Sequence, residues 1–96
     1  MTFVSTENKG VGMTFENGFG ISVQWGTMNY CEKKNLGADG GEEMKTPRWE
    51  SRTAEIAIYK DGKFIDIGDD NDTVIGWLSP DEVAKLITIV PTFDTT

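Results

Sequence analysis

Alternating apolar and polar residues predict a first β-hairpin near the start of the chain. Apolar side chains alternate with small or polar ones over residues 11–15 and again over 19–25, which is the period of a half-buried strand. Glu16-Asn17-Gly18 lies between the two segments. As a three-residue loop with Gly18 in the left-handed region, it gathers the apolar side chains on one face, whereas a two-residue Asn-Gly turn would divide them between faces. The predicted pairs are Val11 with Val23, Met13 with Ile21, and Phe15 with Phe19.

A second hairpin is predicted around Asp61-Gly62, a dipeptide typical of two-residue turns. Residues 54–59 enter the turn and residues 64–67 leave it, and both segments are rich in isoleucine. The predicted pairs are Ile58 with Ile65, Ile56 with Ile67, and Tyr59 with Phe64 on the opposite face. Residues 74–77 predict a further short strand.

The strongest local pattern is the start of a helix at Ser79. Ser79 fits the N-cap, Pro80 fits the first helical position, and Glu82 completes a capping box. An apolar stripe follows, and Pro91 ends the helix. The stripe consists of Val83, Leu86, Ile87 and Val90. The sequence therefore predicts an α+β fold, in which an antiparallel sheet of two or more hairpins packs against one C-terminal helix over about residues 79–90.

The 96 residues predict a single domain. Residues 1–9 and 91–96 are expected to be loose termini. Residues 32–53 show no sustained period and contain three glycines, so we expect a long loop there. Loops of this length in a small domain are either functional or disordered.

Composition limits the chemistry that the chain can perform. It has no histidine and a single cysteine, Cys31, so Ser-His-Asp and Cys-His catalysis and most zinc sites are excluded. We expect no enzymatic activity, no cofactor and no metal. A net charge of −7 opposes direct binding to nucleic acid or to anionic membranes. The chain has neither an apolar run long enough to span a bilayer nor the features of a signal peptide, so we expect a cytoplasmic protein that does not contact a membrane.

Amphipathic side chains are dense just after the strand that ends near Trp25. The candidate partner-binding residues here are Trp25, Asn29 and Tyr30, because tyrosine and tryptophan are enriched at protein interfaces. If the long loop folds back, Asn29 and Tyr30 can form a polar cluster with Glu55. The alternative is a core tryptophan, a turn at residues 27–29 and a buried, inert Cys31.

Two further groups are candidate binding residues. Arg48, Trp49 and Arg52 combine guanidinium groups with an aromatic ring, a combination that can hold a phosphate and stack on a base. The alternative is exposed arginines around a tryptophan that packs on the sheet.

Asp69, Asp70 and Asp72 form an acidic segment that either is a solvated loop or is read by a partner. Its composition is that of a calcium loop, but the EF-hand spacing is missing.

Five segments, at residues 15–18, 21–26, 29–31, 54–57 and 76–83, resemble in their order small uncharacterised proteins of tailed bacteriophages. The resemblance covers roughly residues 11–90. It implies a phage accessory protein in the cytoplasm of a bacterial host, where such proteins bind host machinery, including defence systems. We therefore expect a non-enzymatic protein that binds and modulates or inhibits a bacterial or phage protein. The alternative is a module that sequesters a nucleotide-like signal molecule. The oligomeric state is left open.

Overall fold

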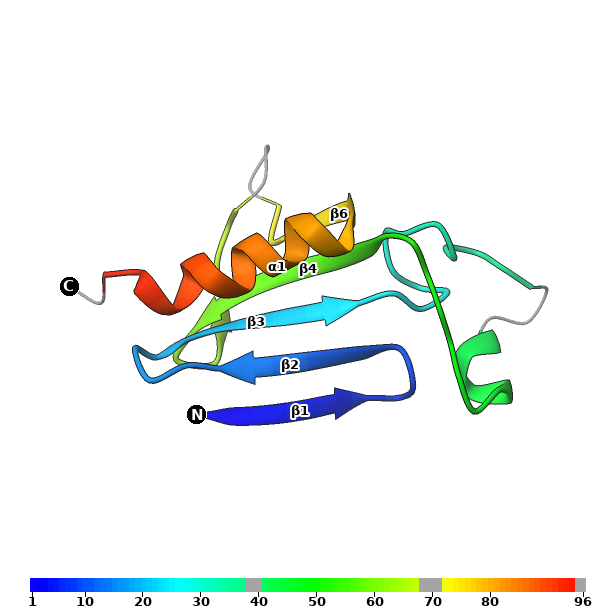
Figure 1. Ribbon diagram of the computed structural model, residues 1–96, viewed down its shortest axis with the longest axis horizontal. Helices are drawn as coiled ribbons and strands as arrows, with labels where there is room; N and C mark the ends of the chain where they lie inside the picture. The colour runs from blue at the N-terminus through cyan, green and yellow to red at the C-terminus, as the bar shows by residue number, and fades with distance from the viewer. Residues whose placement is uncertain (38–40, 68–71, 95–96) are drawn as a thin grey trace.

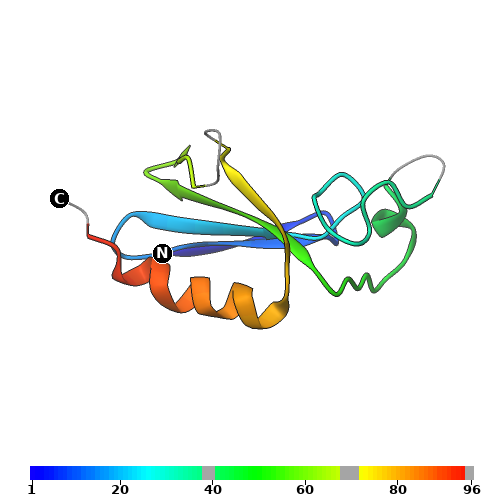
Figure 2. The same ribbon diagram turned by 90° about the horizontal axis from the view of Figure 1, so that it is seen from above.

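A computed structural model describes residues 1–37, 41–67 and 72–94. Within these ranges the chain forms an antiparallel sheet of six strands with one helix on one face (Figures 1 and 2). The strands are β1 (Thr2–Thr6), β2 (Gly10–Thr14), β3 (Phe19–Gln24), β4 (Ala54–Lys60), β5 (Lys63–Phe64) and β6 (Val74–Leu78). The first four lie in chain order, and β5 and β6 both pair with β4. The predicted α+β architecture is confirmed.

The register of the first two predicted strands is also confirmed. In the β2–β3 pair, Met13 lies opposite Ile21 and Val11 opposite Val23. The Phe15 N–H donates to the Phe19 carbonyl at 2.7 Å, and Gly18 has a φ of 88°. The three-residue loop is therefore selected by burial of one sheet face, because the other register would expose half of the apolar side chains.

The second hairpin is confirmed at its turn and corrected further along. The Ile65 N–H donates to the Ile58 carbonyl at 2.9 Å, and Tyr59 lies opposite Phe64. The predicted pairing of Ile56 with Ile67 is wrong, because Ile56 pairs with Ile75 of β6. Strand β5 ends at Phe64, and the Ile67 N–H donates to the Asp72 carbonyl instead, so the rest of the β4 edge is left for β6.

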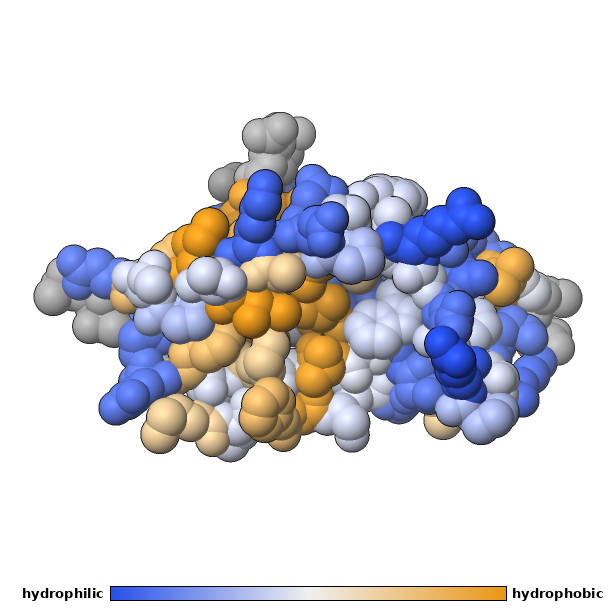
Figure 3. Space-filling view, in the orientation of Figure 1, coloured by the Kyte–Doolittle hydropathy of each residue, from blue (hydrophilic) through white to orange (hydrophobic). Residues whose placement is uncertain are grey.

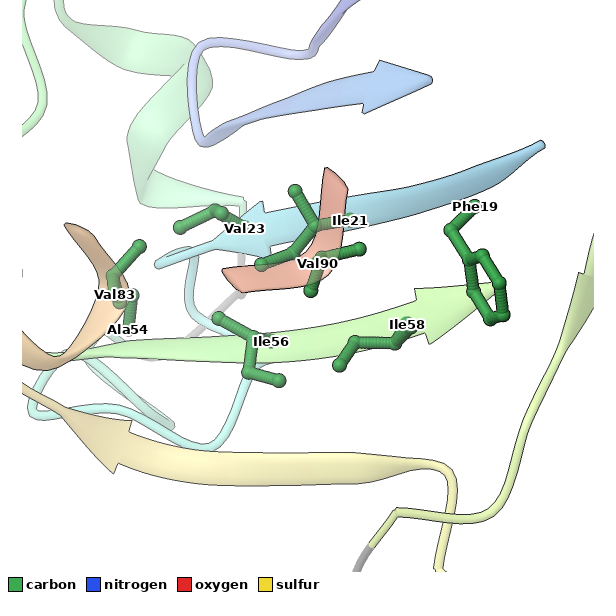
Figure 4. Close-up of a cluster of buried hydrophobic side chains, with 8 residues drawn as sticks. All are labelled: Phe19, Ile21, Val23, Ala54, Ile56, Ile58, Val83 and Val90. Carbon is green, nitrogen blue, oxygen red and sulfur yellow. The ribbon is translucent and has the colours of Figure 1, made fainter. Parts of the chain in front are cut away.

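The predicted capping box is present at the start of helix α1 (Pro80–Ile89). The Ser79 side chain accepts from the Glu82 N–H, and the Glu82 carboxylate accepts from the Ser79 N–H at 2.9 Å. The helix ends one residue earlier than predicted, and a 3₁₀ turn, η3 (Val90–Thr92), follows. The stripe faces the sheet, where buried side chains of α1, η3, β3 and β4 point toward one another (Figure 4). Val90 is fully buried in this core.

Both termini are more ordered than predicted. Residues 2–6 form β1, which pairs with β2 along its whole length, so the expectation of a loose segment 1–9 is wrong. Residues 91–93 are also fixed. The Phe93 ring packs edge-on against Phe19 with centroids 5.2 Å apart, and the Asn17 side-chain amide donates to the carbonyls of Val90 and Phe93. Residues 95–96 lie outside the described part of the chain.

The sheet face opposite the helix carries Tyr59, whose ring packs over Gly20 of β3. A Cβ atom on Gly20 would come within 2.2 Å of the Tyr59 ring, so only glycine permits this position. The Tyr59 hydroxyl donates to the Met13 carbonyl at 3.0 Å and lies 3.1 Å from the Thr14 hydroxyl. Tyr59 thereby ties β4 to β2 across β3.

Candidate binding surface

The segment between β3 and β4 extends beyond one end of the sheet (Figure 1). Two tryptophans at its ends hold it there. The Trp49 indole N–H donates to the Trp25 carbonyl at 2.8 Å, and the Trp25 indole N–H donates to the Trp49 carbonyl at 3.2 Å. Both rings are partly buried. The reciprocal pair closes the long connection onto the sheet.

The polar cluster predicted around Glu55 is present. The Glu55 carboxylate accepts from the Tyr30 N–H at 2.8 Å and from the Asn29 amide at 3.4 Å. Asn29 also accepts from the Gly26 N–H at 2.8 Å. Cys31 is buried, as the alternative interpretation of this segment required. The network fixes the backbone of residues 26–31 against β4.

A second network in the connection centres on Glu43, which the sequence analysis missed. Glu43 is buried in the 3₁₀ turn η1 (Glu42–Lys45), and its carboxylate accepts from the Thr27 N–H and hydroxyl at 3.2–3.4 Å. The Thr27 hydroxyl also accepts from the Gly41 N–H at 3.0 Å. No periodic pattern surrounds Glu43 in the sequence, so nothing there distinguishes it from its half-buried neighbour Glu42. Its contacts fold η1 back onto the turn at Thr27.

An aromatic pair on the surface joins this connection to β6. The rings of Tyr30 and Trp77 have centroids 5.5 Å apart, although the side chains remain 44% and 57% exposed. The Trp77 N–H donates to the Tyr30 carbonyl at 2.8 Å. The Lys34 ammonium lies 4.9 Å from the Tyr30 ring centroid. Tyr30 was a predicted binding residue, whereas Trp77 was predicted only as part of a short strand over residues 74–77.

The backbone that presents this pair is unusual at two consecutive positions. Trp77 has a φ of 54°, a left-handed conformation that is rare for a bulky side chain. A Cβ atom on Gly76 would lie 2.5 Å from the Tyr30 Cβ and 2.8 Å from its carbonyl oxygen, so only glycine fits there. The register of β6 against β4 shifts between Ala54 and Ile56. This bulge re-aims the side chain of Trp77, as bulges at sheet edges commonly do.

On the helix side, the same end of the sheet carries an apolar cleft of about 300 Å³. It lies between α1 and the strands and is lined mainly by aliphatic side chains, with Trp25 and Arg52 among its residues. Arg48 and Trp49 do not line it. Arg48 pairs instead with Glu50 at 2.5 Å, and Lys33 lies 5.7 Å from the Trp49 ring centroid. The structure therefore does not bring the predicted Arg48, Trp49 and Arg52 into one site.

The helix N-terminus beside the cleft offers no vacant anion site. The Glu82 carboxylate accepts hydrogen bonds from the Ser79 backbone N–H and from the Ser79 side chain. Because both bonds favour the ionised carboxylate, they hold the pKa of the Glu82 carboxyl below its usual range. A ligand anion at this position would meet the carboxylate first. Arg52 is then the basic residue at the cleft.

The structure describes only part of the predicted acidic segment. Asp69 and Asp70 lie outside the described residues, and the Asp72 carbonyl accepts from Ile67. Across residues 1–37, 41–67 and 72–94, no three acidic, cysteine or histidine side chains gather as metal ligands. Nor does any helix in these ranges have the length and apolar character to cross a membrane.

The fold and this surface define a small α+β protein with an exposed aromatic pair, Tyr30 and Trp77, at one end of its sheet. No family model, curated protein or solved structure matches the chain. Its function must therefore be inferred from the surface itself.

Proposed function

We propose that the chain is a non-enzymatic protein-binding module whose docking surface is the Tyr30–Trp77 pair. The observation that carries this proposal is an exposed aromatic pair held by a strained backbone. A left-handed conformation in a non-glycine residue costs roughly 1–3 kcal/mol, and such strain is concentrated at functional sites. A tryptophan held at this cost and left mostly in solvent contributes little to the core.

The chemistry of the pair is that of an interface hot spot. Tryptophan and tyrosine dominate the residues whose truncation weakens protein–protein binding most, and they bury a large area for little loss of side-chain entropy. Hydrogen bonds to Glu55 and Trp77 fix the Tyr30 backbone on both sides before any partner arrives. A preorganised surface of this kind binds with a smaller entropic cost than a flexible one.

The resemblance to small proteins of tailed bacteriophages supplies the setting of the proposal. The partner would be a bacterial host protein or a phage protein in the bacterial cytoplasm, and binding would modulate or inhibit it. A component of a host defence system is the partner class that best fits an accessory protein. The net charge of −7 would favour a basic docking surface through long-range steering.

Affinity capture with matched variants tests the proposal. Trp77→Asn removes the ring and keeps a residue that tolerates the left-handed conformation. Met44→Asn, which removes an exposed apolar side chain of η1, is the control. We expect a bacterial or phage protein to be captured by the original chain and by Met44→Asn and lost with Trp77→Asn or Tyr30→Ala. Capture that is equal for all four folded proteins would contradict the assignment.

The apolar cleft favours a second candidate function, binding of a small anionic ligand. Its volume of about 300 Å³ is at the lower limit for small-molecule sites, and Trp25 and Arg52 offer an aromatic surface and one positive charge. A nucleotide-like signal molecule has this chemistry, with a base to stack and a phosphate for the guanidinium. A rise in melting temperature with a nucleotide panel would be expected to vanish in Arg52→Ala and persist in Arg48→Ala. An equal rise in both variants would exclude the cleft.

A further inference from the structure

We infer that two copies of the chain pair through strand β1, antiparallel and centred on Val4, to form a closed dimer. The inference does not depend on the proposed function, because β1 and the Tyr30–Trp77 pair lie on opposite margins of the sheet. In the part of the chain that the structure describes, β1 pairs only with β2 and forms one edge of the sheet. An edge strand presents a row of backbone N–H and C=O groups to another chain.

The two edges of the sheet differ in how they are protected. At the β4 side, β5 has two residues, and β6 is interrupted by the register shift and by the left-handed Trp77. These features are among those that keep natural sheet edges from pairing. Strand β1 has none of them: Thr2–Thr6 is regular, without proline, charge or bulge, and in register with β2 throughout. One unprotected edge allows a closed pair of copies but no open-ended stack.

Apolar side chains are also exposed along this edge. Phe3 is 82% exposed and Val4 54%. On the helix side, Phe3 lines a hollow together with Met13, Phe15 and Pro91, and the polar residues Glu16 and Asn17 also line it. Figure 3 shows apolar residues gathered below the helix, over β2 and β1.

Charge identifies a second copy as the occupant. Residues 2–15 contain one acidic residue, Glu7, and one basic residue, Lys9, so this hairpin is neutral and the rest of the chain carries the net charge of −7. Two copies that meet elsewhere bring like charges together, whereas copies that meet at β1 do not. Strand β1 itself, residues 2–6, carries no charge that would attract a basic partner.

The geometry of the pair follows from the strand. With Val4 on the two-fold axis, Val4 lies opposite Val4 of the second copy, and Phe3 lies opposite Ser5. The two Phe3 rings then lie on the helix face as diagonal neighbours, a separation that aromatic side chains can bridge. An interface formed by one exposed five-residue strand lies at the small end of the range for specific interfaces. We therefore expect a weak dimer whose population depends on the protein concentration.

Sedimentation velocity tests the inference on the full chain from about 1 μM to about 500 μM. We expect the mass to rise from the 10.6 kDa monomer toward twice that value. Val4→Lys should remain monomeric, because the two-fold axis brings the two ammonium groups together, and Thr88→Lys on the helix should dimerise like the original chain. A monomer across the whole range, or dimerisation of Val4→Lys equal to that of Thr88→Lys, would overturn the proposal.

Cysteine substitution tests the register. Val4→Cys places two thiols across the axis, where Cβ atoms are about 5 Å apart, so oxidation should give a disulfide-linked dimer. In Thr2→Cys the thiols lie roughly 14 Å apart at about 3.4 Å per residue, so this variant should not cross-link. Cys31 is buried in both. Cross-linking of Thr2→Cys that equals or exceeds that of Val4→Cys would refute the pairing centred on Val4.

Discussion

Replacement of Gly76 by alanine should displace Tyr30 and so disrupt the Tyr30–Trp77 pair. The added Cβ would lie 2.5 Å from the Tyr30 Cβ and 2.8 Å from the Tyr30 carbonyl oxygen. A rotamer change cannot relieve this overlap, since one of the two atoms belongs to the backbone. The Tyr30 backbone is itself held by the Trp77 N–H on one side and the Glu55 carboxylate on the other, each at 2.8 Å.

The size of the expected loss in the free energy of unfolding follows from these contacts. Overpacking of a closely packed site costs about 1–3 kcal/mol, and a lost hydrogen bond adds about 0.5–1.5 kcal/mol. We expect Gly76→Ala to lower the free energy of unfolding by about 2–4 kcal/mol. A loss of 1 kcal/mol lowers the melting temperature of a domain of this size by roughly 4–8 °C, so the melting temperature should fall by roughly 8–32 °C.

Gly12→Ala is the matched control, because it is also a glycine-to-alanine change in a strand. The nearest atom to a Cβ on Gly12 is the Val4 Cβ at 3.7 Å, and its φ is not positive. Such a change is neutral or stabilises by about 0.4–1 kcal/mol. Urea unfolding followed by circular dichroism measures both variants. If Gly76→Ala were as stable as Gly12→Ala, the claim that Tyr30 is held rigidly against β6 would be refuted.

Three further substitutions test other parts of the structure. Asn17→Ala removes the amide that binds the carbonyls of Val90 and Phe93, so calorimetry should show a loss of about 1–3 kcal/mol, and an unchanged stability would contradict the docked C-terminal segment. Glu43→Ala removes the acceptor for Thr27, so limited proteolysis should cleave residues 32–53 much faster than in Glu42→Ala, which removes only the ion pair with Lys45. Glu82→Gln tests the lowered pKa. Since the carboxyl binds its proton less readily in the folded state, the stabilisation is present above about pH 4.3, the usual pKa, and is lost as the pH falls through the lower folded pKa. The difference in melting temperature between the original chain and Glu82→Gln should therefore shrink from pH 7 to pH 3, and a constant difference would contradict the assignment.

Local patterns were sufficient to predict most of the fold. The capping box at Ser79 and the Gly18 turn follow from short-range rules, and burial of one face fixes the register around them. The predicted partner of Ile56 was wrong because residues 64–67 and β6 can both pair with the same edge of β4. The alternation of apolar and polar residues does not show which of the two segments pairs there. The sequence did not predict that residues 2–6 form a strand, for a related reason. These five residues are stabilised by pairing with β2 rather than by a buried face of their own.

Less of the candidate binding surface could be predicted from the sequence. Asn29, Tyr30 and Glu55 could be grouped because each carries an amphipathic or polar side chain near a strand end. Trp77 could not, because its exposure results from a bulge and a left-handed φ that no pattern of apolar residues encodes. Glu43 is similar, because its burial depends on the path of the long connection. In both cases tertiary contacts, rather than local propensity, determine the position of the side chain.

The affinity of a captured partner for Trp77→Asn, measured by isothermal titration calorimetry, tests the proposed docking surface most directly. Loss of a tryptophan hot spot costs at least about 2 kcal/mol, so the dissociation constant should rise roughly 30-fold or more while the variant stays folded. Met44→Asn should bind like the original chain. A dissociation constant for Trp77→Asn within about twofold of the original would show that the partner binds elsewhere.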